Sequence, residues 1–234
     1  MRGPPSDYAA PPIYVYRERP RPKVHFSRVE LVQLFVAILA LSLALTLLNV
    51  LQLRRFASPS MSVLLLIFLS SFVAVGTGVG IHEVAHKVVA QRYGHWAEFR
   101  YNLMGLMLAF VFAFMGFIYG APGATYISGS VTREQNGRIS AAGPSSNIVI
   151  GAAFLGVAVF ASSGFLATSL AAEILALIVV NAAFMNAILA GFNMIPIMPL
   201  DGAKVWAWNK PAYFGIIALV AGLFVGGYYL GVFS

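Results

Sequence analysis

Two apolar stretches without a charged residue, 31–51 and 211–231, most strongly constrain how this chain can fold. Each is about 20 residues long, which as a helix matches a bilayer core of roughly 30 Å. Charged residues make up only 10 % of the 234 residues and hydrophobic ones 59 %, whereas a soluble domain carries about 25 % charged residues. The composition excludes a soluble monomer and predicts an all-α polytopic membrane protein.

Apolar runs predict about six transmembrane helices. They lie at about 29–53, 61–92, 102–120, 141–162, 166–192 and 211–231. Because the chain contains no cysteine, we expect no disulfide bonds. Residues 29–234 are expected to form a single membrane-embedded domain. Asn181 and Asn186, inside one of the runs, are expected to hydrogen-bond between helices.

The first 28 residues are rich in both arginine and proline. They hold six of the 15 basic residues and six of the 12 prolines. Proline at this density blocks helix and sheet, so we expect 1–28 to be a disordered tail. Basic segments next to a span stay in the cytoplasm, which predicts a cytoplasmic N-terminus on a multi-pass protein of the cell membrane. The alternative, a nucleic-acid-binding arm, lacks the basic and aromatic module that would follow it.

His82, Glu83 and His86 form the pattern H-E-x-x-H within the second apolar run. Histidines at i and i+4 project from one face of a helix, so both rings can reach a single Zn²⁺, and the glutamate can act as a base. Ionisable groups inside a span are costly and need a compensating partner. The alternative is a helix end at the interface, with both rings solvated by headgroups. Glycines at 76, 78 and 80 either allow close packing or loosen the helix.

A zinc site for hydrolysis needs a third protein ligand and an open position. Asp201 is the predicted third ligand, because it follows a segment in which Pro196 and Pro199 prevent a helix. Non-helical backbone at membrane depth is tolerated only where it lines a cavity or is buried in protein. The residues that compete for this role are His95, Glu98, Glu134 and Glu173.

The motif HEVAH at 82–86, followed by N-x-x-P-x-x-P-L-D-G at 193–202, resembles the site-2 protease family of intramembrane zinc metalloproteases. The segment A-G-P-S-S-N at 142–147, expected to open the helix between the two metal motifs, is also similar to that family. The resemblance covers about 61–210, which would be the catalytic core. One departure is Ala85, where members of the family often carry glycine.

This resemblance implies a site and a reaction. One Zn²⁺ per chain would be held by His82, His86 and Asp201. Glu83 would be the general base, and Asn193 would hold the substrate or the oxyanion. The implied enzyme is an intramembrane zinc metalloendopeptidase that cleaves in or near transmembrane segments of other proteins, as in regulated intramembrane proteolysis. Its partners would be those substrates and the lipid bilayer, with no nucleic acid.

The competing class is a metal-binding membrane protein without hydrolysis, either a zinc transporter or a catalytically silent scaffold. A transporter would line a route across the bilayer with further ligands, and apart from Glu30 at the start of the first predicted span, the only other acid in a predicted span is Glu173. A silent homologue would normally have lost the glutamate or a ligand. The sequence therefore favours the protease.

The metal site also constrains the topology. With the N-terminus in the cytoplasm, the span 61–92 runs inward and places His82 near the inner face. Asp201 can reach the same depth in the membrane only if the run 102–120 does not cross from one face of the membrane to the other. We therefore predict that 99–130 is a re-entrant segment or small β-hairpin, in which 122–128 forms an edge strand beside the metal. Such an edge could pair with an unwound substrate. The alternative is an ordinary span at 102–120.

Overall fold

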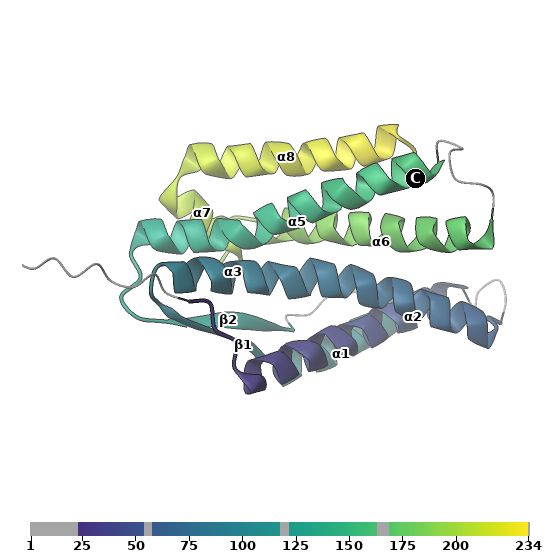
Figure 1. Ribbon diagram of the computed structural model, residues 1–234, viewed down its shortest axis with the longest axis horizontal. Helices are drawn as coiled ribbons and strands as arrows, with labels where there is room; N and C mark the ends of the chain where they lie inside the picture. The colour runs from purple at the N-terminus through teal and green to yellow at the C-terminus, as the bar shows by residue number, and fades with distance from the viewer. Residues whose placement is uncertain (1–22, 54–57, 118–121, 163–168, 234) are drawn as a thin grey trace, which may run out of the picture.

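The computed structural model describes residues 23–53, 58–117, 122–162 and 169–233. Most of the tail expected at 1–28 lies outside this range. Figure 1 shows an elongated bundle in which the long helices run side by side along one axis. The helical stretches long and apolar enough to cross a membrane are α1 (Arg28–Leu53), α2 (Met61–Val75) continued through the π-turn η1 (Gly76–Gly80) into α3 (Ile81–Arg92), α5 (Arg133–Ser162), α6 (Leu170–Asn193) and α8 (Lys210–Tyr229). The chain is a multi-pass membrane protein with a helical fold.

Five spanning stretches are found in the described residues, rather than about six. The remaining apolar run forms α4 (Leu103–Phe114), a helix of only 12 residues. At 1.5 Å per residue it is about 18 Å long, which is too short for a bilayer core of about 30 Å. The structure thus favours the re-entrant segment over an ordinary span at 102–120.

A two-stranded antiparallel sheet brackets α4. Strand β1 (Trp96–Tyr101) pairs with β2 (Gly123–Ser128), so that Tyr101 lies opposite Gly123. The backbone N–H of Asn102 donates to the carbonyl of Pro122 at 2.8 Å, which continues the pairing by one step. The chain therefore leaves the sheet through α4 and returns to the point that it left. The predicted hairpin and its edge strand at 122–128 are confirmed.

Helix α5 begins eight residues before the predicted start of this span. The polar segment from Arg133 to Ser140 is helical, and Glu134 and Arg138 form an i,i+4 ion pair at 2.7 Å. Pro144 lies inside this helix rather than at its start. The motif at 142–147 therefore belongs to the interior of a long helix, and the expectation that it opens one is wrong.

The proline-containing segment after α6 is non-helical, as predicted, and leads into the short helix α7 (Asp201–Trp208). Met194 is completely buried and packs with Val205 and Tyr213 in one apolar cluster. A side chain on Gly202 would lie 2.3 Å from the Met194 carbonyl oxygen, so only glycine permits this approach. This packing fixes Asp201 at the first position of α7.

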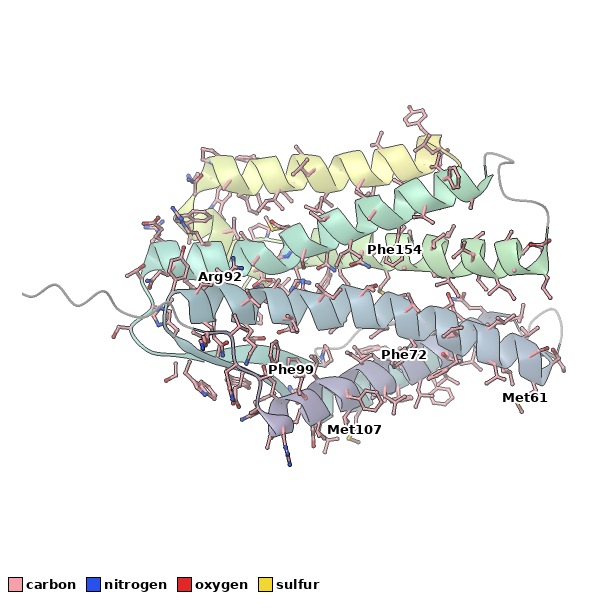
Figure 2. The ribbon with its side chains drawn as sticks, viewed as in Figure 1. Met61, Phe72, Arg92, Phe99, Met107 and Phe154 are labelled. Atoms are coloured by element: carbon pink, nitrogen blue, oxygen red, sulfur yellow. The ribbon has the colours of Figure 1, made fainter. Side chains whose placement is uncertain are left out.

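The hairpin is anchored to the bundle by an apolar cluster. Phe99 of β1, labelled in Figure 2, is 1 % exposed and belongs to one apolar cluster with Leu41 of α1 and Leu106 of α4. This cluster holds both the sheet and the re-entrant helix against α1.

A buried ion pair fixes the same region. The ammonium of Lys87 on α3 lies 2.6 Å from the Glu30 carboxylate on α1 and donates to the Ala97 carbonyl of β1 at 2.8 Å. The second oxygen of Glu30 accepts the backbone N–H of Phe99 at 3.0 Å. Both charged side chains are 1 % exposed. Their contacts join α1, α3 and β1 beside the H-E-x-x-H motif.

Removal of one partner of this pair would leave an uncompensated charge. We expect Lys87→Met to lower the free energy of unfolding by about 3–5 kcal/mol. The double substitution Glu30→Gln with Lys87→Met should recover much of that loss, because glutamine still accepts the Phe99 N–H and carries no charge. Denaturant unfolding in detergent, followed by circular dichroism, measures both effects. Arg92→Met, an exposed position on the same helix, is the control, and equal losses in the single and double variants would contradict this account.

Candidate metal centre and active site

Three side chains predicted as metal ligands converge at the end of the bundle that carries α7. The two Nε2 atoms of His82 and His86 lie 3.0 Å apart, and Asp201 Oδ2 lies 3.3 and 3.0 Å from them. Ligand atoms at 2.0–2.1 Å from a tetrahedral Zn²⁺ are separated by about 3.3 Å. The three residues are buried, and they form the group within the described residues that could hold a metal ion.

The outer nitrogen of each histidine is bonded to an oxygen. His82 Nδ1 lies 2.5 Å from Asn147 Oδ1, and His86 Nδ1 lies 2.7 Å from the Ile139 carbonyl. These oxygens only accept, so each Nδ1 carries the hydrogen and each neutral ring presents a lone pair at Nε2. Two lone pairs and a carboxylate oxygen that face one another repel unless a cation lies between them. The donor set therefore fits a metal such as Zn²⁺.

A buried chain of amides fixes the orientation of Asn147. Its Nδ2 donates at 2.8 Å both to the Gly78 carbonyl and to Asn186 Oδ1. Asn186 in turn donates to the Ala182 carbonyl and to Thr77 Oγ1, at 2.8 and 3.2 Å. Because both amide nitrogens are occupied by acceptors, Asn147 must turn its oxygen to the histidine. The expectation of hydrogen bonds between helices is confirmed for Asn186 but is wrong for Asn181, whose amide donates to the Leu177 carbonyl of its own helix.

The π-turn before the motif allows α6 and α5 to reach this region. A side chain on Gly78 would lie 2.7 Å from Leu189 of α6, and the Gly78 carbonyl accepts the Asn147 amide. The π-turn lies directly before α3, a position typical of π-turns at functional sites. The glycines expected at 76–80 thus both permit close packing and change the helix.

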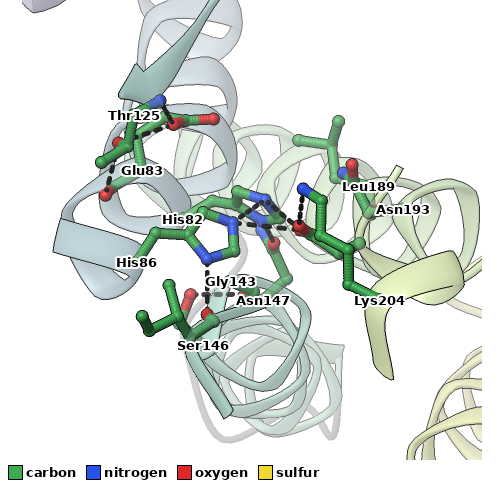
Figure 3. Close-up of polar contacts among 12 residues, drawn as sticks. His82, Glu83, His86, Thr125, Gly143, Ser146, Asn147, Leu189, Asn193 and Lys204 are labelled. Carbon is green, nitrogen blue, oxygen red and sulfur yellow. Dashed lines mark hydrogen bonds and ion pairs between the residues drawn. The ribbon is translucent and has the colours of Figure 1, made fainter. Parts of the chain in front are cut away.

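Helix α5 approaches the histidines at Gly143. A β-carbon at this position would lie 2.5 Å from His86 Nε2 and 2.6 Å from His82 Nε2. No side chain larger than hydrogen fits there. The glycine of the segment 142–147 therefore provides room for the metal group, and Asn147 one turn later supplies the contact that orients His82 (Figure 3).

Asp201 has a second charged neighbour. Lys204 Nζ lies 3.4 Å from Asp201 Oδ1, the carboxylate oxygen that does not face the histidines. A positive charge next to a carboxyl group favours the ionised form of that group. Asp201 is therefore a carboxylate, the form that binds a metal ion.

Glu83 points to strand β2. Its Oε2 accepts the backbone N–H and the hydroxyl of Thr125, both at 2.9 Å. In Figure 3 these contacts lie on one side of the two histidines, and Lys204 lies on the other. Glu83 also borders the cavity described next. The predicted base and the predicted edge strand are thus in direct contact.

A cavity of about 280 Å³ adjoins the metal group. Its walls include the three metal-group residues, Glu83, the segment 122–125 with Ile127, and parts of α6 and α7. Asn193 lies on this wall and donates its Nδ2 to the Leu189 carbonyl at 2.9 Å. The cavity brings together every residue that the sequence analysis placed in the site.

The competing third ligands lie elsewhere. His95 Nε2 is 3.1 Å from Gln135 Oε1, Glu98 pairs with Arg100, and Glu134 pairs with Arg138. Glu173 is in the first turn of α6, at the end of the bundle away from α7 (Figure 1). Sequence reasoning missed the roles of Asn147, Thr125 and Lys204. Only Asn147 had a signal, because it belongs to the segment 142–147.

A methyl group at position 143 would occupy the space between the histidines. We expect Gly143→Ala to reduce bound zinc to below about one tenth of the wild-type content, measured by inductively coupled plasma mass spectrometry, because ring displacement destroys a tetrahedral donor set. Gly156→Ala on the same helix is the control, since its β-carbon meets nothing within 4 Å. An unchanged zinc content in Gly143→Ala would refute the close approach of α5 to the two histidine rings.

The amide of Asn147 should matter for zinc affinity although it does not touch the metal. Asn147→Leu removes the acceptor for His82 Nδ1–H, and we expect the dissociation constant for Zn²⁺ to rise about 10–100-fold. Competition with a chromophoric chelator measures this constant. The matched control is Asn181→Leu, because Asn181 donates to the Leu177 carbonyl of its own helix. Equal affinities in the two variants would show that the amide does not orient the ring.

Comparisons with known proteins agree with this geometry. No protein-family model matches the chain, and no solved structure matches it. A protein of Methanocaldococcus jannaschii named "Putative zinc metalloprotease MJ0611" is 36 % identical over 196 residues, which cover 83 % of this chain and 91 % of that protein. A match of this identity and coverage shows common descent, and the chain belongs to this family of zinc metalloproteases.

Proposed function

We propose that this protein is an intramembrane zinc metalloendopeptidase of the site-2 protease type, which cleaves in or near transmembrane segments of other membrane proteins. One observation carries this proposal: both histidines of the metal group lie inside a spanning stretch, next to a cavity bordered by an open strand edge. His82 is ten residues before the end of the span Met61–Arg92, or about 15 Å along the helix. A substrate segment at that depth lies within the membrane.

The chain's own residues supply most of the chemistry. Zn²⁺ held by His82, His86 and Asp201, one ion per chain, would activate a water molecule and polarise the scissile carbonyl. Glu83 takes a proton from the attacking water and passes it to the leaving amine. Asn193, on the cavity wall, holds the substrate carbonyl or the oxyanion.

Strand β2 has a use in this reaction. A helical substrate hides its peptide bonds in backbone hydrogen bonds, so it must unwind before attack. An extended segment can then add to the free edge of a sheet, whose backbone groups hold it in place. The edge of β2 borders the cavity at Gly123, Thr125 and Ile127. Pairing there would place a peptide bond near the metal group.

The charge distribution supports a cytoplasmic N-terminus and a site near the cytoplasmic face of the cell membrane. The nine lysines and arginines of the described residues lie before or at the start of α1, in α3 and β1, at the start of α5, in α7 and at the start of α8. These elements share one end of the bundle (Figure 1). By the positive-inside rule this end faces the cytoplasm, which also gives water access to the site.

Removal of the base should separate metal binding from hydrolysis. We expect Glu83→Gln to retain about one zinc ion and to cleave a model transmembrane substrate in detergent about 10²–10⁴-fold more slowly, because the proton acceptor is lost. Asp201→Ala should lose both zinc and activity. Gel analysis of cleavage and mass spectrometry of the metal content provide the two readouts. Full cleavage by Glu83→Gln would sink the assignment of the base.

A metal carrier without hydrolysis predicts another pattern. Zinc in both wild type and Glu83→Gln, with no cleavage by either, would favour a scaffold or a transporter. Within the described residues, the His82–His86–Asp201 group is the single cluster of three or more potential ligands. A transport route would need further ligands along the bundle.

A further inference from the structure

One edge of the sheet is closed by side chains of α1 and α3. The backbone N–H groups of Phe99 and Tyr101 donate to Glu30 and Gln33, at 3.0 and 3.2 Å. The Ala97 carbonyl accepts from Lys87 at 2.8 Å and from Gln91 at 3.3 Å. Alternate residues of β1 thus direct their backbone groups away from β2 and into fixed partners. No other strand can add on this side.

The register then defines the opposite edge. Residues 97, 99 and 101 of β1 lie opposite 127, 125 and 123 of β2. In an antiparallel pair of strands, residues that face each other form either a hydrogen-bonded pair or a non-hydrogen-bonded pair. In a non-hydrogen-bonded pair, both residues direct their backbone N–H and C=O groups away from the partner strand. Gly123, Thr125 and Ile127 therefore direct their N–H and C=O groups outward, into the cavity beside the metal group. Thr125 is the central position of this edge.

The central N–H of this edge already has a partner. Glu83 Oε2 accepts it at 2.9 Å, and the Thr125 hydroxyl adds a second contact to the same oxygen at 2.9 Å. The hydroxyl also lies 3.2 Å from the Glu83 carbonyl. In Figure 3 the Glu83 carboxylate is turned to Thr125 and away from the rings of His82 and His86. The proposed base therefore occupies the donor that a paired substrate strand would need.

We infer that Thr125 couples substrate pairing to release of the base: an extended substrate segment takes the Thr125 N–H, and Glu83 is thereby freed to turn to the metal group. This inference rests on the proposed function and adds its regulation. One N–H cannot serve a carboxylate and a peptide carbonyl with good geometry at once. Thr125 is thus a positioning residue, which acts on the reaction through Glu83.

The coupling would select the class of substrate. A segment that stays helical offers no free backbone groups to β2, so Glu83 remains on Thr125. A segment that extends over at least three residues can pair with 123–127 and displace the carboxylate. The protein would therefore hydrolyse unwound transmembrane segments in preference to short peptides that bind without pairing.

The test measures binding rather than cleavage. A fluorescent peptide of alternating threonine and valine is titrated into zinc-depleted protein in detergent, and its dissociation constant is read by anisotropy. If Glu83 competes for the Thr125 N–H, Glu83→Ala binds the peptide about tenfold more tightly than wild type, equivalent to ~1.4 kcal/mol. Glu83→Gln falls between them, because its amide oxygen is a weaker competitor than a carboxylate.

Threonine variants provide the matched control. Thr125→Val keeps the shape and the backbone N–H but removes the hydroxyl that helps to hold Glu83, so we expect peptide binding about threefold tighter than wild type. Thr125→Ser restores the hydroxyl and should match wild type. The same peptide N-methylated at every residue cannot pair as a strand and should bind no variant. In the zinc-loaded protein, Thr125→Val should lower KM for the pairing peptide more than it changes kcat.

Several outcomes would overturn the coupling. Equal or weaker peptide binding by Glu83→Ala would show that Glu83 and the strand do not compete. If the N-methylated peptide bound as tightly as the unmethylated one, contacts other than strand pairing would hold the peptide. If the unmethylated peptide bound to none of the variants, the edge of β2 would not be a docking site. These results do not depend on hydrolysis. If the protein cleaves membrane substrates but wild type and Glu83→Ala bind the peptide with equal affinity, only the coupling is refuted. If Glu83→Ala binds the peptide more tightly but the wild type cleaves no membrane substrate, the proposed protease is refuted.

Discussion

Polar groups inside a membrane bundle must all find partners, because lipid and apolar side chains offer none. At this site one set of hydrogen bonds meets that need and also arranges the candidate metal ligands. Asn147 satisfies His82 Nδ1 and is itself held by Gly78 and Asn186. The same bonds fix the ring tautomer and turn Nε2 toward Asp201. Helices α5 and α6 thus orient a ligand that α3 carries, and the close approach at Gly143 makes this possible.

Buried charged groups hold the hairpin in place, and they too are all paired. Lys87 is the next residue after a predicted metal ligand, and it reaches in another direction to Glu30 and to the β1 backbone. One turn of α3 therefore positions both the metal group and the sheet. Because β1 is closed by these contacts, the exposed pairing edge is the one beside the cavity. Under the proposed function, this arrangement would confine strand addition to the side where the peptide bond can react, and it would also limit edge-to-edge association with other chains.

Local features of the chain predicted much of the fold and the site. Hydropathy located the spanning stretches, because a bilayer imposes a length on any helix that crosses it. The i,i+4 spacing brought His82 and His86 onto one face, since that relation depends only on helix geometry. Prolines at 196 and 199 marked the break before Asp201. The start of α5 was placed too late, because the polar residues 133–140 suggested a loop. They form a helical segment with one buried face, made by Gly137, Ile139 and Ser140, while the charged residues on the other face stay exposed.

Contacts between distant segments could not be derived in this way. Glu83 and Thr125 are 42 residues apart, and Asn147 and His82 are 65 apart. Neither pair leaves a periodic pattern, since each depends on how two elements pack. The sequence by itself determined a helical membrane protein with two histidines and a glutamate on one helical turn. Only the tertiary structure decided that the predicted acid, Asp201, meets the two rings, which nitrogen of each ring faces it and which strand edge stays open. These features depend on the relative placement of helices, which hydropathy and local spacing leave free.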